Sequence, residues 1–221
     1  MTSIKGFADL LLMGAVGEMD EAQKKSGLAI IKENADRLSG LVNDVLEISK
    51  IDAGRDQLNV EAIDVSEVLD QVVNNLQSRM DTRKKQLHVG VNIAPDLPEL
   101  QADRDKLIRI LSNIVDNAFN YTYAGGSIDL SVQPQGERMV FSVKDTGIGI
   151  PEEFQPRVWR RFERFDQHAL VMDVAGTGLG LSIVKELVEL HNGQIWFESQ
   201  LNQGTTFFIS LPLKQPGFVT N

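Results

Sequence analysis

The chain has 221 residues and carries 22 lysine and arginine residues against 31 aspartate and glutamate residues, so its formal net charge is −9 at pH 7. With 42% hydrophobic residues and no cysteine, this is the composition of a globular protein of one or two domains, and it excludes a disordered chain, a disulfide framework and a thiolate metal site. The apolar run at residues 10–13 is far shorter than the ~18 residues of a membrane-spanning helix, and the negative charge disfavours nucleic acid, so we expect neither membrane contact nor a nucleic-acid partner.

The first 55 residues predict a helical hairpin, because they contain no proline and their apolar residues recur at helical spacing. One arm is expected over residues 2–16, and Asp20 is a candidate N-cap of the second arm. Apolar residues of the second arm recur three and four positions apart, as in a coiled-coil seam: Leu28, Ile31, Ala35, Leu38, Val42 and Val45. Two helices alone bury little surface, so we favour a dimeric four-helix bundle, with a packing face inside one subunit as the alternative.

A domain boundary is expected near residue 55, because Gly54 ends the helical pattern there. Beyond it, helical periodicity over residues 65–85, 105–121 and 181–191 is mixed with strand-like alternation over residues 87–93, 128–132, 139–143, 194–199 and 206–211. We therefore predict an α+β fold, with a helical hairpin over residues 1–55 followed by an α/β sandwich over residues 56–221.

The helix expected at residues 105–121 has an amide face. Asn113, Asn117, Asn120 and Tyr121 gather on the side opposite its apolar residues. Asparagine is a mediocre helix former, so propensity does not explain three of them in register. An amide oxygen suits Mg²⁺, which prefers oxygen ligands, although a solvated polar face is the alternative interpretation.

A buried carboxylate is expected at the end of the strand that begins near residue 138. Asp145 follows Met139, Phe141 and Val143 at the same alternation, so it emerges on their side of the strand. A buried acid needs a partner, and the exocyclic amine of a purine would donate a hydrogen bond to it. The glycines that follow Asp145 would let the backbone approach such a base closely, although a simple turn also explains them.

A second glycine cluster, residues 176–181 (GTGLGL), immediately precedes a predicted helix whose N-terminal amides could hold phosphate. It is not a Walker A loop, because no Gly-Lys-Ser/Thr follows, and the loop-like residues before it disfavour a dinucleotide fingerprint. Between the two glycine clusters lies a basic run formed by Arg157, Arg160, Arg161 and Arg164. This run indicates either a guanidinium that reaches a terminal phosphate or a solvated helix face.

In their order, these motifs resemble the Bergerat-type ATP-binding domain of the sensor histidine kinases of two-component systems. Residues 113–121 (NIVDNAFNY) are similar to the family's N box, residues 145–150 (DTGIGI) to its G1 box and residues 158–165 (VWRRFERF) to its F box. Residues 176–181 look like the G2 box and residues 204–207 like the small final box. Since the hairpin resembles the family's dimerisation and histidine phosphotransfer module, the resemblance covers almost the whole chain.

The resemblance implies an ATP-dependent protein-histidine kinase with ATP and Mg²⁺ as cofactors. Such an enzyme is cytoplasmic or membrane-attached, forms a homodimer through the hairpin, and passes the γ-phosphate to a histidine and then to an aspartate of a response-regulator receiver domain. By the same resemblance Asn117 would ligate Mg²⁺, Asp145 would read the adenine amine, and Arg164 would reach toward the γ-phosphate. The other residues implied to contact ATP are Asn113, Asn120, Tyr121, Gly147, Gly149, Ile150, Gly176, Thr177, Gly178, Leu179, Gly180, Leu181 and Thr205.

The sequence departs from the family pattern in two places. Asn120 stands where the family often has a phosphate-contacting lysine, and Arg160 and Glu163 interrupt the F box, which predicts weaker phosphate affinity. Residues 1–6 look like the segment that follows the family's His-Glu-x-x-Thr-Pro motif, so the acceptor histidine is expected to precede Met1. The histidines that are present, His88, His168 and His191, are expected to be structural, because their spacing suits neither a metal site nor an acceptor.

Two other functions remain open at this level. An ATP-hydrolysing relative of the gyrase, MutL and Hsp90 type would carry a glutamate one helical turn before the metal-binding asparagine, but Asn113 occupies that position and is no base. A non-catalytic, nucleotide-gated dimerisation module is favoured if Asn120 and the altered F box abolish tight ATP binding.

Overall fold

The computed structural model describes residues 21–54, 57–163 and 177–215. The chain divides into two compact units, Met1–Gly54 and Arg55–Asn221. The division falls at the glycine that was expected to end the helical pattern.

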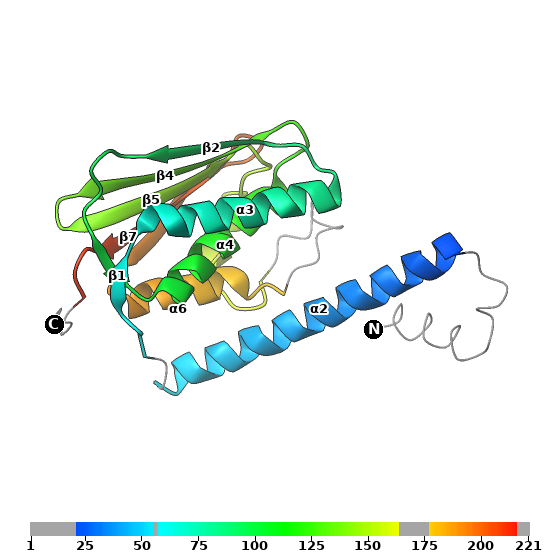
Figure 1. Cartoon of the computed structure of the whole chain (residues 1–221), viewed down its shortest axis with the longest axis horizontal. Coiled ribbons are helices and arrows are strands. Elements are labelled where there is room, and N and C mark those ends of the chain that lie inside the picture. The colour runs from blue at the N-terminus through cyan, green and yellow to red at the C-terminus, as the bar shows by residue number, and fades with distance from the viewer. Residues whose placement is uncertain (1–20, 55–56, 164–176, 216–221) are drawn as a thin grey trace. The chain divides into compact units, whose positions relative to one another are not determined.

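The first unit contains the long helix α2 (Glu21–Asp52) (Figure 1). Its C-terminal end turns at Gly54, which adopts a φ of 61° and donates its N–H to the carbonyl of Ile51 over 2.8 Å. A positive φ is the conformation that glycine adopts most readily at the end of a helix. The predicted first arm, residues 2–16, and the predicted N-cap Asp20 lie outside the described residues.

The second unit is a two-layer α+β sandwich, as predicted (Figure 1). In chain order its elements are β1 (Glu61–Ile63), α3 (Val65–Arg83), β2 (His88–Ile93), β3 (Leu100–Ala102), α4 (Arg104–Tyr121), β4 (Ser127–Gln135), β5 (Arg138–Asp145), the 3₁₀ turn η2 (Gln155–Arg157), α6 (Gly180–Leu190), β6 (Gln194–Gln200) and β7 (Gly204–Pro212). Helices α3, α4 and α6 cover one face of the large sheet (Figure 1).

The large sheet has the strand order β2-β4-β5-β7-β6. All its neighbouring strands are antiparallel except β2 and β4, which run parallel. The short strands β1 and β3 pair in a separate two-stranded sheet. The sequence analysis predicted the five long strands but not the parallel pair, and it missed β1 and β3, which are only three residues long.

The core forms between the sheet and the helices. On β5 the alternation predicted from the sequence is confirmed, because Met139, Phe141 and Val143 are buried and Asp145 follows them on the same side. Helix α4 contributes a fully buried apolar face to this core: Leu107, Ile110, Leu111, Ile114 and Val115. The sheet alternation therefore delivers a carboxylate to the edge of an apolar core.

Helices α4 and α6 are joined at one end by a buried polar cluster. His191, the C-cap of α6, is fully buried, and its Nδ1 lies 2.7 Å from the carbonyl oxygen of Leu187. Its Nε2 accepts the backbone N–H of Asp103 over 3.1 Å, so the proton lies on Nδ1. The structural role predicted for His191 is therefore confirmed.

Candidate functional site

Asp145 is the centre of the candidate site. Its side chain is only 6% exposed, and its Oδ1 accepts the backbone N–H groups of Gly147 (2.8 Å) and Thr205 (3.3 Å). Among the described residues, nothing donates a hydrogen bond to Oδ2. Burial raises the pKa of the Asp145 carboxyl to about 6, and the two backbone hydrogen bonds oppose that rise. The site thus holds one buried carboxylate oxygen that is available to an outside donor.

The loop after Asp145 lies against the C-terminal end of α4. Ile148 donates its N–H to the carbonyl of Tyr121 over 3.0 Å. A Cβ on Gly147 would stand 2.4 Å from the same carbonyl oxygen, a distance that no side chain tolerates. Gly149 has a φ of 67°, and a Cβ there would stand 2.0 Å from the carbonyl oxygen of Gln200. Both positions need glycine because other backbone fills the space that a side chain would take.

A pair of hydroxyl groups stabilises the other side of this loop: Thr205, which the sequence analysis named, and Ser199, which it missed. Ser199 accepts the N–H of Ile150 at its Oγ over 2.8 Å, and the same Oγ lies 2.8 Å from the Thr205 hydroxyl. Thr205 in turn donates its backbone N–H to Asp145. The available signal was the strand pattern, because Ser199 follows Ile195 and Phe197 on the inward face of β6.

The amide face of α4 lies beside this loop, and its asparagines have different environments. Asn113 donates its Nδ2 to the carbonyl of Arg109 over 3.0 Å, so half of its amide is used by its own helix. Asn117 and Asn120 are half-buried, and their side-chain amides form no hydrogen bond with any described residue. Tyr121 contributes its backbone carbonyl to the Asp145 loop.

The second glycine cluster begins α6 next to the amide face. A Cβ on Gly180 would stand 3.0 Å from the Oδ1 of Asn113, which places the start of α6 directly against α4. Gly178 has a φ of 72°, and the Leu179 N–H is held by the Thr177 hydroxyl over 3.2 Å. The Leu179 side chain is fully buried and anchors the loop in the core, while Leu181 and Ile150 are partly exposed.

Two of the three described arginines of the basic run are paired with carboxylates, and Arg160 forms no ion pair with a described residue. Arg157 forms an ion pair with Glu163 at 2.5 Å, and Arg161 with Glu186 of α6 at 2.6 Å. The sequence analysis considered these guanidiniums as contacts to a terminal phosphate. The ion pairs make both of them less available for that contact. Arg164 and Gly176 lie outside the described residues, as does His168.

The amide face of α4 offers oxygen donors of the kind that Mg²⁺ prefers. No cluster of three or more histidine, cysteine, aspartate or glutamate side chains able to hold a metal occurs in the described part of the chain. Mg²⁺ commonly takes only one or two protein oxygens and completes its shell with water and phosphate. The amide of Asn117, which has no partner among the described residues, can supply one such oxygen.

Comparison with known proteins identifies the family. Residues 102–215 match the family model described as "Histidine kinase-, DNA gyrase B-, and HSP90-like ATPase", and residues 1–54 match "His Kinase A (phospho-acceptor) domain". This chain belongs to the sensor histidine kinases. It is 35% identical over 212 residues to the circadian input-output histidine kinase CikA of Synechococcus elongatus, a match that covers 96% of this chain and 28% of the relative. It is also 35% identical over 218 residues to the sensor protein kinase WalK of Staphylococcus aureus strain MRSA252, covering 96% of this chain and 34% of that protein.

A solved structure supports the same fold. The crystal structure of full-length ShkA in complex with AMPPNP superimposes with a TM-score of 0.75 at 29% identity, over 89% of this chain and 40% of that one. The chain spans about a third of the length of the two curated relatives, CikA and WalK. The predicted fold class and family are confirmed: a phosphoacceptor-type segment is followed by a histidine kinase ATP-binding domain. The described helices include none that is both long and apolar enough to cross a lipid bilayer.

Proposed function

We propose that residues 55–221 bind ATP with Mg²⁺ and that the γ-phosphate passes to a histidine and then to an aspartate of a response-regulator receiver domain. The observation that carries this proposal is Oδ2 of Asp145, an oxygen of a buried carboxylate that receives no hydrogen bond from any described residue. An adenine amine would donate a hydrogen bond to this oxygen, while the neighbouring glycines leave room for the base against the backbone.

The phosphates would lie toward the start of α6. The N–H groups of its first turn have no partner within the helix, and the helix dipole favours negative charge there. Asn117 would hold the metal, which when bound supplies positive charge to the phosphates. The other proposed contacts to ATP are Asn113, Asn120, Tyr121, Gly147, Gly149, Ile150, Arg164, Gly176, Thr177, Gly178, Leu179, Gly180, Leu181 and Thr205.

Phosphotransfer is favoured over hydrolysis by the environment of Asn113. Its amide donates to the Arg109 carbonyl and has no basic atom that could activate a water molecule. Residues 1–54 contain no histidine, so the acceptor in this proposal is a histidine that the present sequence does not include.

Dimerisation through the helical hairpin is part of the proposal. Helix α2 exposes large apolar side chains at the predicted seam, with exposed fractions between 42% and 60%: Leu28, Leu38, Val42 and Val45. Side chains of this kind are stabilised by burial against a second copy. We also propose a cytoplasmic location for this part of the protein, because the chain belongs to the sensor histidine kinases.

The decisive experiment measures nucleotide affinity by calorimetry for the parent chain and for Asp145→Asn. The amide replaces one acceptor oxygen with a donor, so we expect ATP affinity to fall by about 100-fold. Asp129→Asn, a conservative change on the neighbouring strand β4, is the matched control and should bind ATP like the parent. Equal ATP affinity in a folded Asp145→Asn variant would exclude the proposed adenine contact.

The transfer step is tested by adding a histidine-bearing hairpin segment of a related kinase and radiolabelled ATP. Acid-labile, alkali-stable label on that segment is expected from the parent chain and not from Asp145→Asn. ATP binding without any labelled histidine in the presence of that segment would favour the nucleotide-gated module instead.

A further inference from the structure

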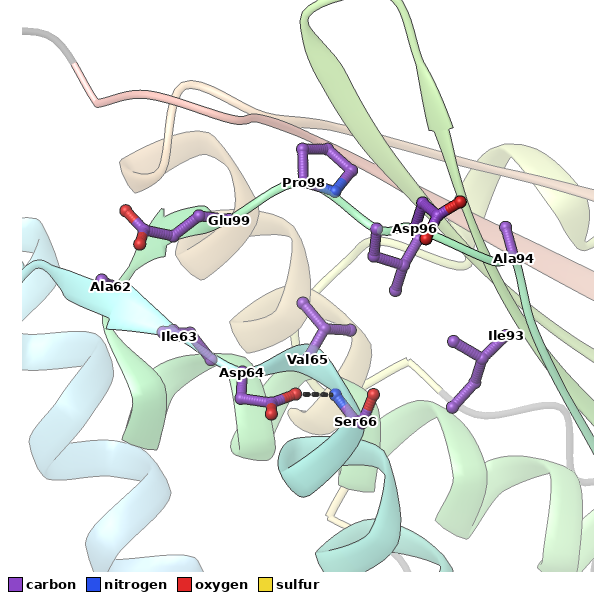
Figure 2. A pocket seen from close by; sticks show the side chains of 11 residues that line it. Ala62, Ile63, Asp64, Val65, Ser66, Ile93, Ala94, Asp96, Pro98 and Glu99 are labelled. Atoms are coloured by element: carbon purple, nitrogen blue, oxygen red, sulfur yellow. Dashed lines mark hydrogen bonds between the residues drawn. The ribbon is translucent and has the colours of Figure 1, made fainter.

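A second concave site lies away from the residues proposed to bind ATP. It is a cavity of about 470 Å³ between the junction of β1 with α3 and the segment that links β2 to β3 (Figure 2). None of its lining residues belongs to the proposed ATP site. The proposed function therefore leaves this cavity unexplained.

The cavity is lined by a mixture of aliphatic and polar groups. Val65 of α3 and Ile93 at the end of β2 lie on two sides of it (Figure 2). Seven of its eleven lining residues are aliphatic or proline: Ala62, Ile63, Val65, Ile93, Ala94, Leu97 and Pro98. The apolar surface continues outward along the edge strand β2, where Val91 is 41% exposed and Ile93 is 39% exposed.

The charged groups at the rim all have the same sign. Asp64, Asp96 and Glu99 line the cavity, and Figure 2 shows Asp96 and Glu99 on the same connecting segment. Within the described structure, neither Asp96 nor Glu99 forms an ion pair. Neither residues 57–78 nor residues 89–103 contain a lysine or an arginine. The charged residues that line the cavity are thus all acidic, and none of them forms an ion pair with a described residue.

The aliphatic and acidic lining residues together indicate which kind of ligand the cavity would bind. The N-terminal end of α3 would attract an anion, but the carboxylates at the rim repel one. A lining that combines aliphatic residues with carboxylates instead complements a lysine or arginine side chain, whose methylene stem packs on apolar groups while its charged head lies near the carboxylates.

We propose that this cavity and the adjoining residues of β2 form a docking site for a segment of a partner protein that carries a lysine or arginine next to aliphatic side chains. The cation would occupy the cavity between Asp96 and Glu99, and an aliphatic neighbour would cover Val91 and Ile93. A free polyamine is the poorer fit, because it would leave the exposed aliphatic groups of β2 uncovered.

The test uses the full chain labelled with ¹⁵N and three probes: the capped peptides Leu-Arg-Leu and Leu-Glu-Leu, and spermidine. Leu-Arg-Leu should give saturable amide shifts at Ala62, Ser66 and Asp96 with a Kd on the order of 1 mM, a value typical of so small a ligand. Leu-Glu-Leu should give none.

The double variant Asp96→Asn with Glu99→Gln should weaken the Leu-Arg-Leu response by about fivefold, because it removes two charges that attract the cation. Asparagine is suited to position 96, where φ is 56°, so the fold should persist. Asp70→Asn with Glu137→Gln changes the net charge equally at exposed positions outside the cavity and should leave the response intact. The proposal would be overturned if both double variants lost the Leu-Arg-Leu response equally or if the amide shifts lay outside the cavity. It would also be overturned if spermidine bound as tightly as Leu-Arg-Leu.

Discussion

The two ends of the α4 and α6 pair differ in how completely their buried polar groups are hydrogen-bonded. At the Asp103 and His191 end, both ring nitrogens of His191 have partners, and both carboxylate oxygens of Asp103 accept backbone N–H groups, from Lys106 and Asn59. Gln215 adds a hydrogen bond to the His191 carbonyl. This end of the helix pair is a completed network, which fixes the two helices against each other.

The opposite end leaves polar atoms without partners. Among the described residues, Oδ2 of Asp145, the amide of Asn117 and the fully buried hydroxyl of Thr122 have none. Buried polar groups are usually paired, so unpaired groups gathered at one end call for an explanation. A ligand that completes their hydrogen bonds supplies one. The same two helices are therefore fixed by a complete hydrogen-bond network at one end, while at the other end polar groups have no partner among the described residues.

A substitution at the Asp103 and His191 end should lower the stability of the protein without lowering its affinity for ATP. Asp103→Ala removes the N-cap of α4 and two acceptor contacts, so we expect ~2–4 kcal/mol less stability. ATP affinity should change less than about twofold, because Asp103 lies at the far end of α4. Urea unfolding followed by the fluorescence of Trp159 and Trp196, both in the second unit, measures the loss.

A matched control for this prediction is Asp64→Ala. Asp64 caps α3 with a single contact to the Ser66 N–H at an exposed position, so its removal should cost only about 1 kcal/mol. If Asp103→Ala weakens ATP binding as strongly as it lowers stability, the two ends of the helix pair are not independent.

The incomplete end should show the opposite relation, in which loss of function raises stability. Asp145 has a folded pKa of about 6 against 3.8 in the unfolded chain, so its favourable contribution is full below pH 3.8 and is lost as the pH rises through 6. At pH 7.5 the buried carboxylate therefore opposes folding. Asp145→Asn should raise the free energy of unfolding by ~1–3 kcal/mol at pH 7.5, and by less at pH 5.

Unfolding curves of both proteins at the two pH values test this prediction, with Asp129→Asn as the control for an aspartate outside the site. A parent chain that is more stable than Asp145→Asn at pH 7.5 would show that the carboxylate is structurally required and is not reserved for a ligand.

The amide of Asn117, which has no partner among the described residues, should affect binding only in the presence of the metal. Asn117→Ala removes one proposed oxygen ligand, so we expect ATP affinity to fall about tenfold with Mg²⁺ and to stay nearly unchanged with a chelator. Asn117→Asp keeps an oxygen ligand and should retain the Mg²⁺ dependence. Equal losses with and without Mg²⁺ would indicate that Asn117 contacts the nucleotide directly.

Sequence periodicity predicted the long elements and the position of Asp145, because alternation along β5 is a local property that burial makes visible. It did not separate Asn113 from Asn117, since the hydrogen bond from Asn113 to Arg109 depends on a rotamer that spacing does not determine. Ser199 was missed because its partners, Ile150 and Thr205, come from distant parts of the chain that only the folded sheet brings together. The ion pairs of Arg157 and Arg161 likewise depend on tertiary contacts with Glu163 and Glu186.

Asn120 offers the smallest and most specific test of the incomplete end. It lies one turn beyond Asp116 and next to Phe119, whose ring is approached by the cations of Arg79 and Lys85 at 5.1 and 4.8 Å. Asn120→Lys adds a further positive charge on the half-buried amide face, so ATP should bind about threefold more tightly if that face borders the phosphates. Adenosine, which has no phosphate, should bind equally to parent and variant and serves as the control ligand. Calorimetry with ATP, ADP and adenosine measures how the gain in affinity depends on the phosphate charge of the ligand. If Asn120→Lys raises the affinity for adenosine as much as that for ATP, Asn120 lies at the base end of the site.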